Sequence, residues 1–219
     1  MFVVKAMAVD YPIEVGGVKI TSSNSNNVLG DGTVKYDDAT KTLTLRNANL
    51  KGVSDVITDY RYYGDLTINL IGTNIVNANL TALRTDGANV IITGDGTLNI
   101  NGINLDEGNL TIKGNAKVNV LKSNFYAIDL RGADLSVLDN AELNVKGNGK
   151  DETFWGIGKL TLGKGFIIHQ ENLSYSSTKQ SIVDDAGNRT KGEVNIYNAN
   201  NYKKYWLAIE GVQLSEFNA

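Results

Sequence analysis

Charged side chains recur at a fixed position ahead of a repeated apolar residue. Asp86 and Asp106 each lie four residues before the residue that opens a repeat, and Arg131 occupies that position in the next one. If the repeats stack as strands of one sheet, neighbouring members of this column lie about 4.8 Å apart. Two carboxylates at that separation suit a retaining glycoside hydrolase, and an acidic pair also suits Ca²⁺. The competing interpretation is that charges of both signs on exposed turns pair with one another and contribute little.

A second column lies two residues earlier in each repeat. It contains Arg84 and Asp129, with Asn104 between them. The two columns together give one cluster of candidate site residues, Asp86, Asp106, Asp129, Arg84 and Arg131. A lyase acting here would need a base beside a bound metal, and Arg131 is the candidate for it. Three interpretations of this cluster stay open: a Ca²⁺ site, a catalytic pair, or surface ion pairs.

Aromatic residues gather in the segments that lead into a repeat: Tyr60, Tyr62, Tyr63, Phe125, Tyr126, Phe154 and Trp155. We take Phe125-Tyr126 and Phe154-Trp155 as equivalent. Because neighbouring strand residues point to opposite faces, Phe125 and Phe154 are expected inside, with Tyr126 and Trp155 facing solvent. Exposed aromatic rings bind sugars through the C–H faces of the sugar ring. The candidate ligand-binding residues are Tyr126, Trp155, Tyr60 and Tyr62. The alternative is that Tyr126 and Trp155 lie under a loop.

Composition limits the other chemistry. The chain has no Cys, so disulfides, thiolate nucleophiles and cysteine–zinc sites are excluded. His169 is the only histidine, and we expect it in an outward column of Asn residues, since a base or ligand needs an orienting partner. The net charge of −3 gives no basic surface for nucleic acid. No apolar run approaches the length of about 20 residues that a spanning helix needs. We expect neither a nucleic-acid partner nor membrane insertion.

The candidate residues are positioned by an internal repeat. The segments NVIITGDGTLNI (89–100), NLTIKGNAKVNV (109–120) and DLSVLDNAELNV (134–145) align without a gap, and KLTLGKGFIIHQ (159–170) follows more weakly. Each has two short runs of alternating apolar and polar residues around a corner, which is typical of short strands. The residues that open the repeats are Leu43, Leu66, Val90, Leu110, Leu135 and Leu160, with an insertion of two residues expected before Gly72 in the Leu66 copy.

A period of 20–25 residues with alternating strands predicts a solenoid, because one repeat cannot bury its own apolar face and a neighbour of the same shape must cover it. We predict an all-β, right-handed parallel β-helix of about six to seven coils. The outward residues Asn99, Asn119 and Asn144 would then form a ladder of stacked amides. An exposed ladder of this kind stabilises the stack first, and it offers a second surface to sugar hydroxyls.

The repeat divides the chain into three parts of one β-helix domain, 1–219. Residues 1–42 are expected to form an N-terminal strand and β-hairpin cap, 43–170 the coils, and 171–219 an irregular C-terminal cap. The segment YWLAIEGVQLSEFN (205–218) aligns with YPIEVGGVKITSSN (11–24). Residues 205–219 therefore either open a further module or form an ordinary edge strand. At the N-terminus, Ala6-Met7-Ala8 fits either the end of a signal peptide or a first strand.

Residues 16–50, GGVKITSSNSNNVLGDGTVKYDDATKTLTLRNANL, resemble the entry of a module found in large secreted or surface-anchored bacterial proteins. In that module a G-x-x-V/I-T-S-x-N strand precedes a Y-D-x-x-T-x-T-L-T-L hairpin and rungs of the L-T-I-x-G-x-G-x-L-x-V kind. The resemblance covers Tyr11 to Ile168 and implies a β-helix of pectate-lyase-like shape, located at the cell surface or secreted. It implies adhesion or carbohydrate binding and supplies no catalytic motif.

The sequence therefore leaves three functional hypotheses. The favoured one is a non-catalytic bacterial surface module that binds a glycan or another surface partner, with no cofactor unless the acidic columns hold Ca²⁺. The first alternative is a polysaccharide lyase or glycoside hydrolase on a β-helix, although few long loops are available to wall a cleft. The second alternative is a passive structural spacer within a longer surface protein.

Overall fold

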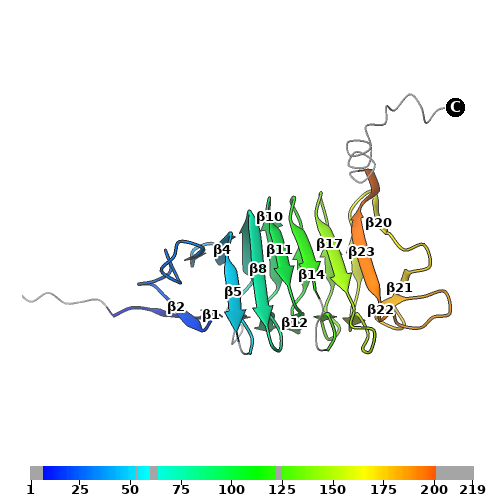
Figure 1. The fold of residues 1–219 in the computed structure, drawn as a ribbon, viewed down its shortest axis with the longest axis horizontal. Helices are drawn as coiled ribbons and strands as arrows, with labels where there is room; N and C mark the ends of the chain where they lie inside the picture. Colours follow the sequence, from blue (N-terminus) through cyan, green and yellow to red (C-terminus); the bar gives the residue numbers. More distant parts are fainter. Residues whose placement is uncertain (1–6, 53, 60–63, 122–124, 201–219) are drawn as a thin grey trace, which may run out of the picture.

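A computed structural model describes residues 7–52, 54–59, 64–121 and 125–200, which form a stack of short strands with almost no helix (Figure 1). Three seven-stranded sheets run along the stack. Sheet A contains β1 (Asp10–Val15), β2 (Val18–Thr21), β6 (Ile57–Asp59), β9 (Leu83–Asp86), β12 (Ile103–Asp106), β15 (Ile128–Asp129) and β18 (Phe154–Trp155). Sheet B contains β3 (Val34–Asp37), β4 (Thr42–Arg46), β7 (Leu66–Ile71), β10 (Val90–Gly94), β13 (Leu110–Ile112), β16 (Leu135–Val137) and β19 (Leu160–Leu162).

Sheet C contains β5 (Asn49–Gly52), β8 (Thr73–Ala78), β11 (Thr97–Ile100), β14 (Lys117–Val120), β17 (Glu142–Lys146), β20 (Phe166–Ile168) and β23 (Glu193–Asn198). A separate hairpin joins β21 (Ser174–Ser176) and β22 (Ser181–Val183). Each turn of the chain contributes one strand to sheet B, one to sheet C and one to sheet A, and strands of successive turns pair in parallel. The predicted all-β parallel solenoid is confirmed.

From the second turn onward, residues that the predicted repeat aligns are register partners in neighbouring strands. In sheet B, Val90 lies between Leu66 and Leu110, and Leu135 follows Leu110. The side chains of this column are at most 1% exposed. Because alternate strand residues point to opposite faces, the intervening polar residues face outward. The core is therefore a set of apolar columns running along the solenoid axis.

The predicted amide ladder is present on the outer face of sheet C. The Nδ2 of Asn119 donates to Oδ1 of Asn99 at 2.8 Å, and Nδ2 of Asn144 donates to Oδ1 of Asn119 at 2.9 Å. Beyond Asn144 the strand β23 intervenes and places Asn195 opposite it. His169 follows in the same column, where its backbone N–H donates to the carbonyl of Asn195. The position predicted for His169 is correct, with one antiparallel strand inserted before it.

Removal of the central amide is expected to cost about twice as much stability as removal of the terminal one. Asn119→Ala breaks both ladder bonds, whereas Asn99→Ala breaks one. At roughly 0.5–1.5 kcal/mol per bond, we expect a loss of about 2 kcal/mol for Asn119→Ala and about 1 kcal/mol for Asn99→Ala. Urea unfolding measures both free energies. Equal losses in the two variants would contradict a ladder that acts through its amide bonds.

The number of turns is lower than the repeat count predicts. The described chain makes about five turns, from β4 to β18, and not six to seven. The difference in the number of turns has two causes, one at each end of the stack. Before β4, the pairs β1–β2 and β3–β4 are antiparallel hairpins and not coils. After β19, the strand β23 enters sheet C antiparallel to both β17 and β20, so the helical path ends there.

The first two turns differ from the predicted alignment. Leu43 pairs with Ile68, not with Leu66. No insertion precedes Gly72, because Thr73 pairs with Thr97 directly. Asn74 therefore takes the inward position of Leu98, with its side chain fully buried, and Ile75 faces outward at 40% exposure. The sequence appeared to need an insertion because this one turn carries a polar residue inside and an apolar residue outside.

Candidate functional site

One column of side chains on the outer face of sheet A runs through five neighbouring strands. Backbone register aligns its members in five consecutive strands: Thr58, Arg84, Asn104, Asp129 and Trp155. They face outward because the residues directly before them in each strand are buried in the core. We call this set the outer column. Its central three members are the ones that the repeat spacing predicts to align.

The outer column contains buried hydrogen-bonding atoms that the described residues leave unpartnered. These atoms are Oγ1 of Thr58, Oδ1 of Asn104 and Oδ1 of Asp129. Asn104 and Asp129 are register partners on adjacent strands, so two of these acceptors are neighbours. Buried polar atoms in folded proteins nearly always have a partner, and an unpartnered one points to a water, an ion or a ligand. Three such atoms therefore share one column of sheet A.

Asp129 is the most perturbed member of the outer column. It is 9% exposed. Burial raises the pKa of its carboxyl above the usual value, and the nearby Arg131 opposes that rise. The Nε of Arg131 lies 3.6 Å from Oδ2 of Asp129, which leaves Oδ1 without a partner. Oδ2 of Asp129 is thus paired with a cation, whereas Oδ1 is buried without a hydrogen-bond partner among the described residues.

The predicted Asp86–Asp106 column is present beside the outer column. The two residues are register partners in β9 and β12, as the repeat predicts. The guanidinium of Arg131 donates to Oδ2 of Asp106 at 2.9 Å and also approaches Asp129. Arg84 lies 3.8 Å from the carboxylate of Asp55. These contacts match the surface ion-pair interpretation of the cluster. Among the described residues, no three His, Asp or Glu side chains lie close enough together to hold a metal ion.

An aromatic stack continues the outer column at its C-terminal end. The rings of Tyr126 and Trp155 lie 5.0 Å apart and nearly parallel, at 17°. On Trp155 lies the guanidinium of Arg189, with Cζ 4.6 Å from the ring centroid. Burial raises the pKa of Tyr126, and the carboxylates of Glu152, Asp129 and Asp151 add to that rise. The indole therefore contacts both a phenol ring and a guanidinium cation.

The aromatic alignment made from the sequence is wrong by three residues. Phe154 pairs with Ile128, and Trp155 with Asp129. Phe154 is buried as predicted, but Phe125 is 63% exposed, so the prediction that it lies inside is wrong. Phe125 precedes β15, and the alternation of faces holds only within a strand. Tyr60, Tyr62 and Tyr63 lie outside the described residues.

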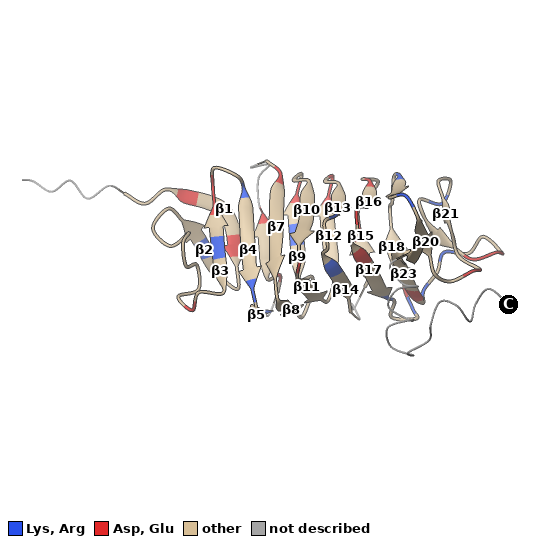
Figure 2. Cartoon of the chain, turned by 90° about the horizontal axis from the view of Figure 1, so that it is seen from above, with Lys and Arg blue, Asp and Glu red and all other residues tan. Residues whose placement is uncertain are grey.

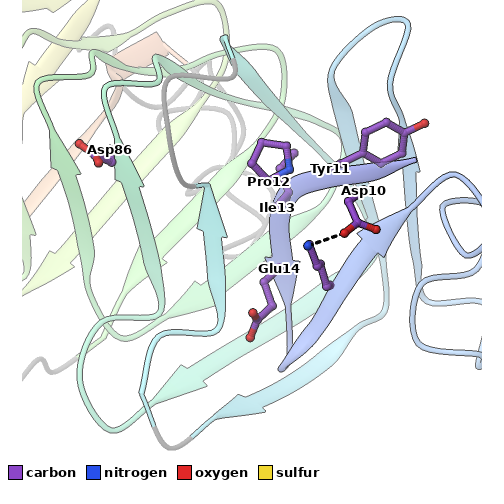
Figure 3. Close-up of a pocket in the computed structure, with 7 residues that line it drawn as sticks. Asp10, Tyr11, Pro12, Ile13, Glu14 and Asp86 are labelled. Atoms are coloured by element: carbon purple, nitrogen blue, oxygen red, sulfur yellow. Dashed lines mark hydrogen bonds and ion pairs between the residues drawn. The ribbon is translucent and has the colours of Figure 1, made fainter. Parts of the chain in front are cut away.

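A shallow groove of about 560 Å³ lies at the N-terminal end of the same face. It is lined by β1, by Lys19 on β2 and by Asp86 on β9 (Figure 3). Lys19 forms an ion pair with Asp10 at 2.6 Å on the β1–β2 hairpin, and Glu14 and Asp86 add two more carboxylates to the lining. Figure 2 shows acidic and basic residues interspersed along the whole solenoid. The groove therefore has mixed charge and adjoins the outer column through Asp86.

Two residues of this region were missed by sequence reasoning. Arg189 lies in the segment after the repeat, where no spacing relates it to Trp155. Asp59 points inward from β6, in the core column of Thr85 and Leu105, and its Oδ1 has no partner among the described residues. The alternation of faces in β6 predicts that Asp59 points inward, because it lies two residues after the core residue Ile57.

No helix in the described part of the chain is long and apolar enough to cross a membrane. Comparison with protein-family models, with curated proteins and with solved structures finds no match to this chain. The parallel β-solenoid and the outer face of sheet A are therefore the features that bear on function.

Proposed function

We propose that this chain is a non-catalytic module, secreted or at the bacterial cell surface, that binds a glycan along the outer face of sheet A. The observation that carries the proposal is the outer column, with three unpartnered buried acceptors beside the Tyr126–Trp155 stack. Sugar hydroxyls are donors that match such acceptors, and sugar C–H faces pack on aromatic rings. A column with one member per coil also suits a polymer that extends along the solenoid axis.

Access to these acceptors requires a side chain to move. Both Oδ1 atoms are covered, and the adjacent side chain of Arg131 is 45% exposed. Rotation of its guanidinium away from Oδ2 of Asp129 frees that oxygen for a hydroxyl donor and loosens the packing around the carboxyl. In this arrangement Asn104 and Asp129 accept hydrogen bonds, Arg131 closes over the ligand, and the aromatic stack holds one sugar ring.

The surface location rests on the resemblance of residues 16–50 to the entry segment of secreted and surface-anchored bacterial modules. Adhesin-type function and pectate-lyase-like shape follow from the same resemblance and belong to this proposal. Fold likeness alone does not identify a function, and the outer column is the stronger support because it is a site on this chain. The Asp106–Arg131 pair favours binding over catalysis, since it neutralises the carboxylate that a hydrolase would use.

A glycan array screened in Ca²⁺ and again in EDTA tests the proposal. We expect saturable binding that Asn104→Leu and Trp155→Ala each weaken about fivefold or more, since one lost hydrogen bond or stacking contact costs roughly 1–3 kcal/mol. Thr111→Val, an outward residue on β13 of sheet B, is the matched control and is expected to bind normally.

Three results would count against glycan binding on this face. A blank array in both conditions would leave the spacer as the better description. A hit that Asn104→Leu leaves unchanged would move the site elsewhere on the molecule. Release of reducing ends from pectin, alginate or glucans would make the chain an enzyme. Sensitivity of binding to EDTA would refine the proposal by adding a metal at the Asp86–Asp106 column.

A further inference from the structure

The aromatic stack at the C-terminal end of the outer column already holds a cation. The guanidinium of Arg189 lies over the ring of Trp155, with Cζ 4.6 Å from the ring centroid. The ring of Tyr126 is stacked on the same indole at 5.0 Å. The face of an aromatic ring is the negative part of its quadrupole and attracts cations. The stack is therefore a cation-binding surface whose occupant belongs to the protein itself.

Acidic side chains act on this stack. Burial raises the pKa of Tyr126, and the carboxylates of Glu152, Asp129 and Asp151 raise that pKa further. The guanidinium of Arg189 lowers it. Three carboxylates and one guanidinium thus act on the same phenol. This surplus of negative charge favours a further cation at the stack.

One of these carboxylates has an oxygen without a hydrogen-bond donor. Asp129 is 9% exposed, its Oδ2 lies 3.6 Å from Nε of Arg131, and its Oδ1 has no partner among the described residues. The register partners of Asp129 are Asn104 on β12 and Trp155 on β18. Oδ1 of Asn104 is likewise buried and unpartnered. Two acceptors that lack donors therefore lie in the column that leads to the indole.

A protonated amine matches both the acceptors and the aromatic ring. An ammonium group has three N–H donors and no acceptor, so it satisfies carboxylate and amide oxygens without adding an acceptor of its own. Its charge is attracted to carboxylates and to the face of an aromatic ring. A sugar hydroxyl has one donor and brings two acceptor lone pairs. In a glycan, the group that fits best is the unsubstituted amine of an amino sugar.

The guanidinium of Arg189 can leave the indole without unfolding a coil. Arg189 belongs to the segment between β22 and β23, after the repeat, and its side chain is 30% exposed. Its Nη2 donates to the carbonyl of Lys179 at 2.9 Å. Its Nη1 lies 3.9 Å from Oε1 of Glu152, which is beyond hydrogen-bond distance. Rotation of this one side chain therefore exposes the indole to another cation.

We propose that the glycan bound along sheet A carries unsubstituted amino groups, and that one ammonium takes the place of the Arg189 guanidinium on Trp155. The carboxylates of Asp129 and Glu152 balance the charge of this ammonium. The inference rests on the proposed glycan binding and adds the class of sugar to it. Sugars that are neutral or N-acetylated lack the cation and are poorer ligands of this site.

Three hexasaccharides with the same backbone linkage separate the amine from the rest of the sugar. Hexamers of chitosan, chitin and cellulose carry an ammonium, an acetamide and a hydroxyl at the same carbon. We expect the chitosan hexamer to bind about tenfold more tightly than the other two, because hydrogen bonds to charged groups and cation–π contacts are stronger than neutral contacts. Calorimetric titration of the full chain measures the three affinities.

Variants assign the preference to particular residues. Asp129→Asn keeps the shape of the side chain and removes its charge, so chitosan is expected to bind no more tightly than cellulose. Arg189→Ala removes the internal competitor and is expected to raise the affinity for chitosan about threefold. Lys191→Ala, which removes one positive charge at an exposed position of the same segment, is the matched control and is expected to leave the affinity unchanged. Urea unfolding reports that each variant is folded.

Equal binding of the chitosan and cellulose hexamers, or an array hit limited to neutral glycans, would overturn the amine and leave glycan binding on this face intact. A blank for all three hexamers together with a blank array would overturn both. Equal gains in Arg189→Ala and Lys191→Ala would show that only net charge matters, and would overturn the exchange at Trp155. Oligolysine that competes as well as the chitosan hexamer would assign the surface to cations in general and would also overturn the proposal.

Discussion

Replacement of Asp59 by Asn is expected to stabilise the protein above pH 7 by as much as about 3 kcal/mol and to change its stability little near pH 4. Asp59 is 2% exposed and points into the core, where Oδ1 has no hydrogen-bond partner among the described residues. Burial raises the pKa of this carboxyl from 3.8 to about 6, although the charge of Lys41 opposes the rise. A difference of about two pKa units corresponds to roughly 3 kcal/mol between the two protonation states.

The direction of the pH effect follows from proton binding. Between pH 3.8 and about 6 the folded state holds the Asp59 proton more tightly than the unfolded state does. The contribution of this group to stability is therefore complete below pH 3.8 and is lost as the pH rises through 6. Asn has nearly the same shape and cannot ionise, so the variant lacks this loss.

Urea unfolding of both proteins at pH 4 and pH 8 measures the difference. Asp185→Asn, on an exposed turn, is the control for removal of one negative charge. The prediction fails if Asp59→Asn and Asp185→Asn show the same pH dependence. It also fails if Asp59→Asn is the less stable protein at pH 8.

Much of the fold was predictable because, in a solenoid, the spacing of the sequence repeats sets the register between strands of neighbouring coils. Each coil must cover the apolar face of the one before it, so the period, the apolar columns and the Asn ladder all follow from one alignment. Asn99, Asn119 and Asn144 align in the sequence and are bonded in the structure. The same periodicity placed Asp86 opposite Asp106 and Asn104 opposite Asp129.

The ends were less predictable because the repeat no longer applies there. The strand β23 runs antiparallel between β17 and β20, a pairing that joins residues far apart in sequence. Arg189 reaches Trp155 from that region. The prediction for Phe125 was wrong because this residue lies before β15, so the alternation of faces within a strand does not apply to it. Sequence spacing predicts contacts between coils, whereas contacts made by the closing segments depend on a path that has no period.

The polar residue inside the second turn gives the sharpest disagreement between pattern and structure. By pattern, Asn74 occupies the column of Leu98 and Val118, and Asn74→Leu should stabilise the core. In the structure its Oδ1 accepts from the N–H of Ala48 at 2.9 Å, and its Nδ2 donates to the carbonyls of Ile71 and Thr97, each at 3.3 Å. The side chain thus bonds backbone groups of three successive turns.

We therefore expect Asn74→Leu to destabilise the protein by about 2–6 kcal/mol. The apolar side chain leaves the buried N–H of Ala48 without its acceptor, and an unpaired buried group costs roughly 1–3 kcal/mol. Leu is also larger than Asn at a site with no exposed surface, and overpacking adds about 1–3 kcal/mol. Asn77→Leu, at an exposed position of the same strand, is the control and is expected to shift stability by less than about 0.5 kcal/mol. An unfolding free energy of Asn74→Leu at or above that of the unmodified protein would show that the column accepts an apolar residue in this turn, and that the three backbone bonds contribute less than their geometry implies.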